Sequence, residues 1–225
     1  MKLESIVPWG RSFEEYRSFF NLAETDLQKR ILGCGDGPAN FNAVLTQQGG
    51  NIISVDPIYE FTADQIRSRI DEVYAQIMSQ VEHNRDNYIW GIIKNVAELG
   101  KVRMHAMNQF LSDYDAGLQF GRYISASLSS LPFTDHQFEL ALCSHFLFLY
   151  SEHLNLDQHI LSMMELCRIA EEVRVYPLIS LDGFESMHLS TVIKALDKGG
   201  IHVALQTVDY QFQKGATSML VAREK

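Results

Sequence analysis

The amino-acid sequence predicts an α/β fold in which a mainly parallel sheet carries helices on both faces. Apolar runs of strand length alternate with amphipathic segments of helical period, and this alternation is typical of a parallel sheet with crossover helices. Of the 225 residues, 46% are hydrophobic and 21% are charged, as in ordinary globular proteins. This length can bury a sizeable core. We therefore expect a single domain over residues 1–225.

Local signals place the individual elements. We expect strands at 30–34, 52–55, 123–126, 138–144 and 173–179, and helices at 13–21, 40–48, 155–170 and 186–196. Ser12 and Glu15 form a capping box at the first of these helices, and Asn155 is a candidate N-cap of the third. The last two strands, 201–208 and 218–223, are joined by a short turn near Lys214 and Gly215. So short a connection makes them antiparallel.

The stretch between the second and third strands is much longer than a crossover requires. It exceeds sixty residues, whereas about a dozen are sufficient. Thr62 and Gln65 form a capping box, and an apolar residue then recurs at three- and four-residue steps from Ile66 to Val81, which predicts a helix of about five turns. A second helix over 89–99 and a third over 102–111 should follow. We expect this helical insertion, residues 62–115, to form a lid at the ligand-binding edge.

Composition and charge exclude several classes of function. The net charge is −9 and no cluster of Lys and Arg is present, which argues against a nucleic-acid partner. No apolar run is long enough to span a membrane. The N-terminus lacks the apolar core of a secretory signal, so we expect a cytoplasmic protein. The three cysteines are widely spaced and fit neither a disulfide framework nor a zinc site, and no metal is expected.

A glycine-rich turn ends the first strand directly before a helix. Residues 33–37 read G-C-G-D-G, where glycines let a ligand approach the backbone and the helix N-terminus offers free N–H groups. Asp56 follows the next strand, where a carboxylate can accept both hydroxyls of a ribose. Either feature alone could be a tight turn or a helix cap. Together they predict a ligand that contains adenosine.

Three passages indicate which ligand this is. Pro38 stands where the dinucleotide-binding turn G-x-G-x-x-G requires a glycine. The turn instead resembles the G-C-G-x-G of class I S-adenosylmethionine-dependent methyltransferases. Residues 127–140, S-L-S-S-L-P-F-T-D-H-Q-F-E-L, are similar to that family's D-x-x-x-LPF-x-D-x-x-FD-L passage, and the closing strand pair is similar to its antiparallel seventh strand. The resemblance covers residues 28–61 and 122–225, and implies a Rossmann-like sheet with S-adenosylmethionine as cofactor.

The resemblance also implies roles for particular residues. The glycines would lie along the methionine and ribose moieties, Asp56 with its neighbour Pro57 would hold the ribose, and further residues would flank the adenine and the sulfonium. These are Gly33, Gly35 and Gly37 for the turn, Ser127 and Leu128 for the adenine, and Ser144 with His145 for the sulfonium. Two positions depart from the family. Ile31 replaces the usual acid near the cofactor's ammonium, and Ser127 replaces a frequent Asp.

Three further side chains are candidates on chemical grounds. Arg11 precedes the first helix and could hold the methionine carboxylate in a two-pronged fork. His145 could act as a general base. Tyr176 closes the fifth strand and could stabilise the sulfonium through a cation–π contact. Each also has an ordinary structural interpretation. Arg11 could be an exposed arginine, His145 a hydrogen-bonded wall residue and Tyr176 a core tyrosine.

The sequence therefore predicts a methyltransferase that acts on a small molecule. In-line transfer mostly requires approach and alignment, which suits a site without an obvious acid or base. Two alternatives stay open. Some proteins of similar fold turn S-adenosylmethionine on itself, giving azetidine-2-carboxylate and methylthioadenosine, and the missing acid at Ile31 would leave the attacking amine less restrained. A binding module without turnover is the other.

Overall fold

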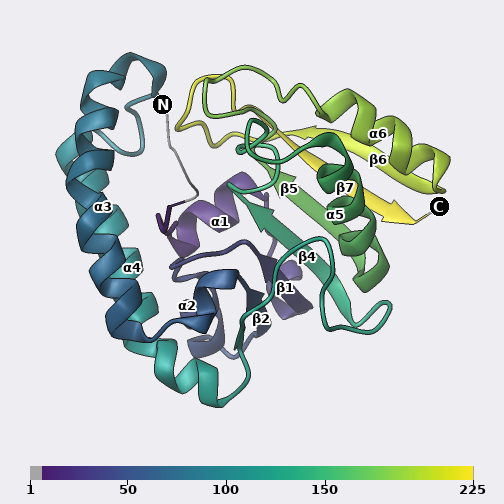
Figure 1. The fold of residues 1–225 in the computed structure, drawn as a ribbon, viewed down its shortest axis with the longest axis horizontal. Helices are drawn as coiled ribbons and strands as arrows, with labels where there is room; N and C mark the ends of the chain where they lie inside the picture. The colour runs from purple at the N-terminus through teal and green to yellow at the C-terminus, as the bar shows by residue number, and fades with distance from the viewer. Residues whose placement is uncertain (1–6, 225) are drawn as a thin grey trace.

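The computed structural model describes residues 7–224 and contains a seven-stranded sheet flanked by helices (Figure 1). The strands are β1 (Arg30–Cys34), β2 (Asn51–Val55), β3 (Tyr123–Ile124), β4 (Phe138–Ser144), β5 (Ala170–Tyr176), β6 (Ile201–Thr207) and β7 (Ser218–Glu224). Their order is β3-β2-β1-β4-β5-β7-β6, and β7 runs antiparallel to both of its neighbours. The predicted α/β fold with an antiparallel closing pair is confirmed.

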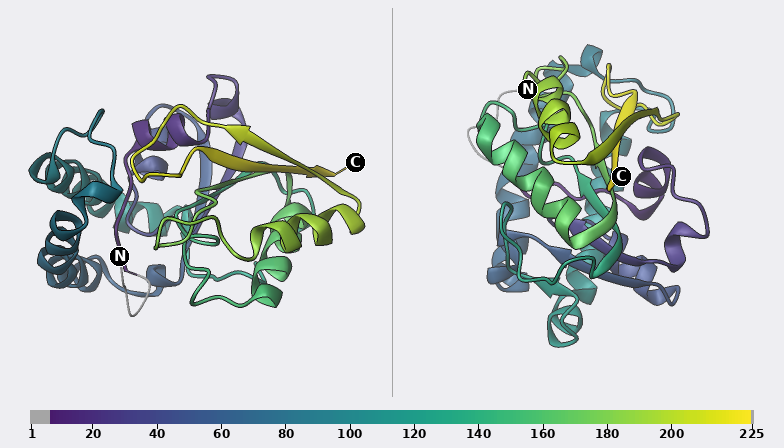
Figure 2. Two further views of the ribbon diagram at one scale, coloured as in Figure 1. Left: turned by 90° about the horizontal axis from the view of Figure 1, so that it is seen from above. Right: turned by 90° about the vertical axis from the view of Figure 1, so that its right-hand side faces the viewer.

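Helices cover both faces of the sheet (Figure 2). On one face, α5 (Leu156–Ile169) and α6 (Leu189–Lys198) pack on a core that includes Leu32. On the other, α1 (Phe13–Phe19) and α2 (Phe41–Gln47) pack on a core that includes Ile31. Neighbouring residues of β1 thus serve opposite faces, as strand geometry requires. No helix in residues 7–224 is long and apolar enough to cross a membrane.

Several predicted boundaries agree with the structure, and others shift. The capping box of Ser12 and Glu15 is present, and so is the cap of α5 by Asn155. β5 ends at Tyr176 rather than 179. Pro177 follows it and has no N–H to donate to a neighbouring strand, so the ladder stops there.

The insertion contains two long helices, so the prediction of three was wrong. They are α3 (Ala63–His83) and α4 (Val96–Gln119). The cap of α4 is Asn95, whose side chain accepts the Glu98 N–H at 2.9 Å. The helix continues through Gly100, where an added Cβ would lie 2.3 Å from the Tyr74 hydroxyl of α3. Glycine therefore serves close helix packing at this point rather than ending the helix.

One buried ion pair attaches the insertion to the rest of the molecule. Arg103 of α4 is 1% exposed and forms a two-pronged contact with Glu15 of α1. The same carboxylate accepts the Tyr210 hydroxyl at 2.6 Å and the Ser12 N–H at 2.9 Å. α3 and α4 stand side by side next to the carboxyl ends of the parallel strands (Figure 1). This is the edge where the sequence placed them.

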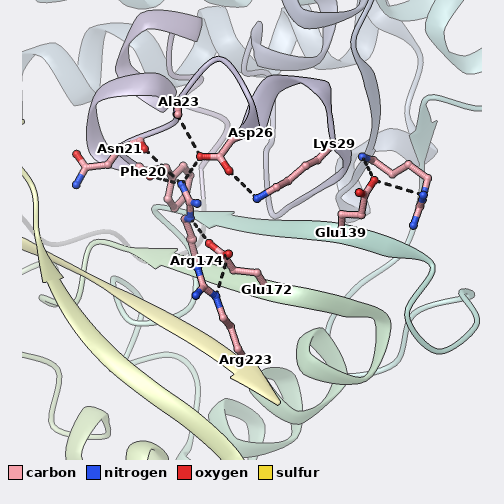
Figure 3. A network of polar contacts seen from close by, with 10 residues as sticks. Phe20, Asn21, Ala23, Asp26, Lys29, Glu139, Glu172, Arg174 and Arg223 are labelled. Carbon is pink, nitrogen blue, oxygen red and sulfur yellow. Dashed lines mark hydrogen bonds and ion pairs between the residues drawn. The ribbon is translucent and has the colours of Figure 1, made fainter. Parts of the chain in front are cut away.

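A second polar network joins the segment after α1 to β5 and β7 (Figure 3). Arg174 donates to Glu172 at 2.6 Å and to the Phe20 carbonyl at 2.8 Å, and it lies 3.1 Å from Asp26. Arg223 of β7 donates to Glu172 at 2.6 Å. Because every charge here has an opposite partner, the network has a structural role.

Candidate functional site

A cavity of about 420 Å³ opens where the carboxyl ends of β1, β2 and β4 meet the insertion. Ligand pockets commonly measure about 300–1,000 Å³. Nearly all the sequence-predicted site residues line it, namely Arg11, Gly35, Gly37, Asp56, Pro57, Ser127, Leu128, Ser144 and His145. Ile77 of α3 also contributes to the wall. Gly33 and Tyr176 do not reach this cavity.

The glycine turn needs glycine at two positions for reasons of backbone geometry. Gly35 and Gly37 have φ angles of +67° and +53°, in the left-handed region that favours glycine. A Cβ on Gly35 would also lie 2.9 Å from the side chain of Phe146. The turn therefore brings bare backbone to the cavity.

Gly33 has a different role from the one predicted. A Cβ at this position would lie 1.8 Å from a carboxylate oxygen of Asp36. Gly33 thus makes room for the buried Asp36 side chain, and its backbone does not line the cavity.

Asp56 stands at the tip of β2 and braces the glycine turn. Its carboxylate accepts the Gly37 N–H and the Ile58 N–H, each at 2.9 Å. A carboxylate has about four lone-pair sites, so two remain for ligand hydroxyls. Burial raises the pKa of Asp56 to about 6, and the two backbone hydrogen bonds oppose that rise.

Asp36 is a second carboxylate in the wall of the cavity. It is 7% exposed and accepts hydroxyls from Tyr16 at 2.8 Å and Ser54 at 2.7 Å. Burial raises the pKa of Asp36 to about 6, against the effect of these hydrogen bonds, and the charge of Asp56 adds to the rise. Both donors are neutral, so the carboxylate has no cationic partner among the described residues.

Arg11 provides a positive charge in the same cavity. Its guanidinium donates to the Trp9 carbonyl at 2.6 Å, and within residues 7–224 it forms no ion pair. Burial and the nearby Arg103 lower the pKa of Arg11 to about 10. Burial alone would favour neutral Glu15, but Arg103 and Arg11 lower its pKa to about 2. Glu15 makes its two-pronged contact with Arg103 alone, so the charge of Arg11 is an excess positive charge in the wall of the cavity.

His145 is a neutral wall residue. Its Nδ1 lies 2.9 Å from the Ser144 hydroxyl, and its ring packs edge-on against Phe19 and Tyr176. Burial, together with the charges of Arg11 and Arg103, holds the pKa of His145 well below its ordinary value. At neutral pH the imidazole is therefore uncharged and a weak base.

Tyr176 packs in the core and does not face the larger cavity. Its ring stacks on Phe19 at 4.9 Å between centroids, and its hydroxyl donates to the Ala216 carbonyl at 3.0 Å. The side chain is 1% exposed and borders an adjoining inner cavity of about 50 Å³, which His145 and Arg103 also line. The structure therefore gives the predicted cation–π residue a packing position.

Comparison with known proteins identifies a relative of nearly equal length. No family model matches the chain. It is 32% identical over 227 residues to the uncharacterized protein MJ0045 of Methanocaldococcus jannaschii, covering 99% of this chain and 98% of the relative. The chain belongs to the MJ0045 family.

Solved structures share the fold of this MJ0045 family member at low sequence identity. WbdD superposes with a TM-score of 0.50 and 9% identity, over 94% of this chain and 39% of that chain. Magnesium protoporphyrin IX methyltransferase (ChlM) from Synechocystis PCC 6803 with bound S-adenosylmethionine superposes with a TM-score of 0.48 and 11% identity, over 90% of this chain and 73% of that chain. A putative S-adenosylmethionine-dependent methyltransferase from Methanococcus maripaludis superposes with a TM-score of 0.47 and 10% identity, over 95% of this chain and 83% of that chain. The fold is the Rossmann-like fold of class I methyltransferases.

Sequence reasoning missed some residues of the site in this MJ0045 family member. Tyr16 and Trp9 line the cavity from the N-terminal segment, and Phe146 lines it from the loop after β4. Asp36 could have been found, because it is the one charged residue inside the G-C-G-D-G turn. Tyr16 and Trp9 carried no local signal, since their positions depend on how the N-terminal segment packs against the sheet, whereas Phe146 follows directly from the end of β4.

Proposed function

We propose that the cavity binds S-adenosylmethionine and that the protein transfers its methyl group to a small molecule. The observation that carries this proposal is the arrangement of charge around the glycine turn. Arg11 adds an excess positive charge to the wall, and Asp56 offers free lone pairs at the tip of β2. S-adenosylmethionine has a carboxylate at one end and ribose hydroxyls near its middle, so its polar groups match both residues.

The remaining walls suit the other parts of this cofactor. Arg11 would hold the methionine carboxylate in a two-pronged contact. Pro57, Ser127 and Leu128 border the cavity and would enclose the adenine. Ser144, at the end of β4, would lie beside the sulfonium. This arrangement follows the general rule that open α/β sheets bind ligands at the carboxyl ends of their strands.

Methyl transfer in this site would depend on alignment and on exclusion of water. The sulfonium is already activated, so the protein mainly has to hold donor and acceptor in line. Neutral His145 could accept a hydrogen bond from an acceptor N–H or O–H. We infer that α3 and α4 act as a lid, since Ile77 of α3 lines the cavity. An enclosed cavity without a basic cluster favours a small acceptor over a nucleic acid.

A second candidate reaction uses S-adenosylmethionine alone. The α-ammonium would first lose a proton to bulk water. The neutral amino nitrogen would then attack the γ-carbon, so that the new C–N bond forms while the C–S bond breaks, releasing azetidine-2-carboxylate and methylthioadenosine. The observation in favour of this reaction is the limited volume available for a second substrate. Beyond the cavity of about 420 Å³, the inner cavity beside His145 measures only about 50 Å³, which leaves little room for a second substrate.

Product analysis tests these proposals. The protein is incubated with S-adenosylmethionine and a pool of small-molecule metabolites, and the products are identified by mass spectrometry, with Asp56→Ala as the control for the site. S-adenosylhomocysteine formed by the wild type supports methyl transfer. Methylthioadenosine formed without added acceptor supports the second reaction. Binding without either product supports a module without turnover, and absence of binding contradicts the cofactor assignment.

A further inference from the structure

The acid that related folds place near the cofactor's ammonium is missing from its usual position. Ile31 stands there, and its side chain is fully buried in the core beneath α1 and α2. Asp36 instead brings a carboxylate to the wall of the cavity by filling the space above Gly33. The site therefore keeps an acid, but supplies it from within the glycine turn.

The surroundings of Asp36 lack a counter-charge. Its two hydrogen-bond donors are the neutral hydroxyls of Tyr16 on α1 and Ser54 on β2. The charged group that faces it is Asp56, which repels it, and the nearby Cys34 thiol is kept neutral because burial raises its pKa. A buried carboxylate without a cation is costly, and a cationic ligand group would relieve that cost.

Asp36 and Arg11 both act on the hydroxyl of Tyr16. The Tyr16 hydroxyl donates to Asp36, and the charge of Arg11 also acts on this hydroxyl. All three residues line the same cavity. An anionic and a cationic side chain in the wall of one cavity are opposite in charge to the ammonium and the carboxylate of an α-amino acid, respectively.

We propose that Asp36 binds the α-ammonium group of the ligand while Arg11 binds its carboxylate, so that the site selects ligands with a free amino-acid head. The proposal rests on the proposed function, because it assumes S-adenosylmethionine as the ligand. It makes Asp36 a specificity-determining residue, whereas Asp56 recognises the ribose that other adenosine compounds share.

Calorimetry with three ligands separates these roles. S-adenosylmethionine and S-adenosylhomocysteine both carry the amino-acid head, the second without a sulfonium charge, whereas methylthioadenosine lacks the ammonium, the carboxylate and the sulfonium charge. The two ligands with the head should respond alike. Asp36→Asn keeps the shape of the side chain and removes its charge, and Asp56→Asn is the matched control. Asp36→Asn should weaken S-adenosylmethionine binding about tenfold to a hundredfold and leave methylthioadenosine within about twofold. Asp56→Asn should weaken all three ligands.

The outcomes distinguish this proposal from the proposed function. Equal weakening of all three ligands by Asp36→Asn, or no weakening of any, overturns the role of Asp36 and leaves the cofactor assignment intact. If the wild type binds none of the three, the proposed function fails and the role of Asp36 fails with it. Circular dichroism checks that each variant is folded.

A pH titration of the wild type keeps the test decisive if Asp36→Asn does not fold. Because burial raises the pKa of Asp36 to about 6, its carboxylate becomes charged between about pH 5 and pH 7. The preference for S-adenosylmethionine over methylthioadenosine, taken as a ratio of dissociation constants, should therefore rise across this range. Asp56 ionises over the same range, and its charge would also favour the cationic groups that only S-adenosylmethionine carries, so the same titration of Asp56→Asn isolates the contribution of Asp36. A flat ratio in folded wild type overturns the proposal.

Discussion

The buried cluster of Glu15, Arg11 and Arg103 predicts that its single acid is more important for stability than the arginine that anchors the insertion. Glu15→Gln would leave the buried Arg103 guanidinium without its anion and would also remove the negative charge that acts on Arg11. Arg103→Met would leave Glu15 with the charge of Arg11, the Ser12 N–H and the Tyr210 hydroxyl. The first change therefore removes all charge compensation, and the second removes only part of it.

The magnitudes follow from the burial of the pair. Arg103 is 1% exposed and Glu15 6%, and breaking a buried ion pair by removing one partner typically costs about 3–5 kcal/mol. We expect Arg103→Met near the lower end of this range and Glu15→Gln near the upper end. The double variant should lose less than the sum of the two single losses, because the residues are in direct contact.

Urea unfolding of the wild type and the three variants measures these free energies. The pKa of Glu15 is lowered to about 2 in the folded protein, below its unfolded value of about 4.3. Its stabilising contribution is therefore present above that unfolded value and disappears as the pH falls from about 4 toward 2. Glu15→Gln should remove this acid-sensitive component. Losses below about 1 kcal/mol for both single variants, or perfect additivity, would refute the charge-sharing interpretation.

Three further changes test individual parts of the site. Arg11→Gln should weaken S-adenosylmethionine about tenfold or more and spare methylthioadenosine, and equal loss of both ligands in calorimetry would contradict a carboxylate contact. Tyr176→Phe should lower the free energy of unfolding in urea by about 0.5–1.5 kcal/mol, because the hydrogen bond to the Ala216 carbonyl is lost. Ligand affinity should not change, and a large loss of affinity would show that the hydroxyl acts in the site. Gly35→Ala should reduce cofactor affinity at least tenfold, because φ is +67° and Phe146 occupies the space, and wild-type affinity in the folded variant would remove the geometric argument.

The sheet was the most predictable part of the fold. β1 and β4 begin and end at the predicted residues, because the central residues of each strand form a short apolar run that is buried in the sheet. The insertion was less predictable. Isoleucines at 89–93 repeat with helical spacing, yet they precede the Asn95 cap and lie outside α4. The predicted helices were separated near Gly100, but α4 continues through this residue, because the missing side chain lets α4 pack closely against α3.

The candidate site was predictable where its residues follow strand ends. The glycine turn and Asp56 converge because β1 and β2 are parallel neighbours. Tyr176 could not be placed, since its ring stacks on Phe19 of α1, a contact between distant parts of the chain. The pairing of Arg103 with Glu15 joins residues 88 positions apart and leaves no local pattern.

Calorimetric titration of the purified protein with S-adenosylmethionine tests the central claim most directly. The account predicts saturable binding of one molecule per chain. It further predicts that a folded Asp56→Ala variant binds more weakly by about 1.5–3 kcal/mol, the range for hydrogen bonds to a charged group. Absence of binding to the wild type, or unchanged affinity in the variant, would contradict it.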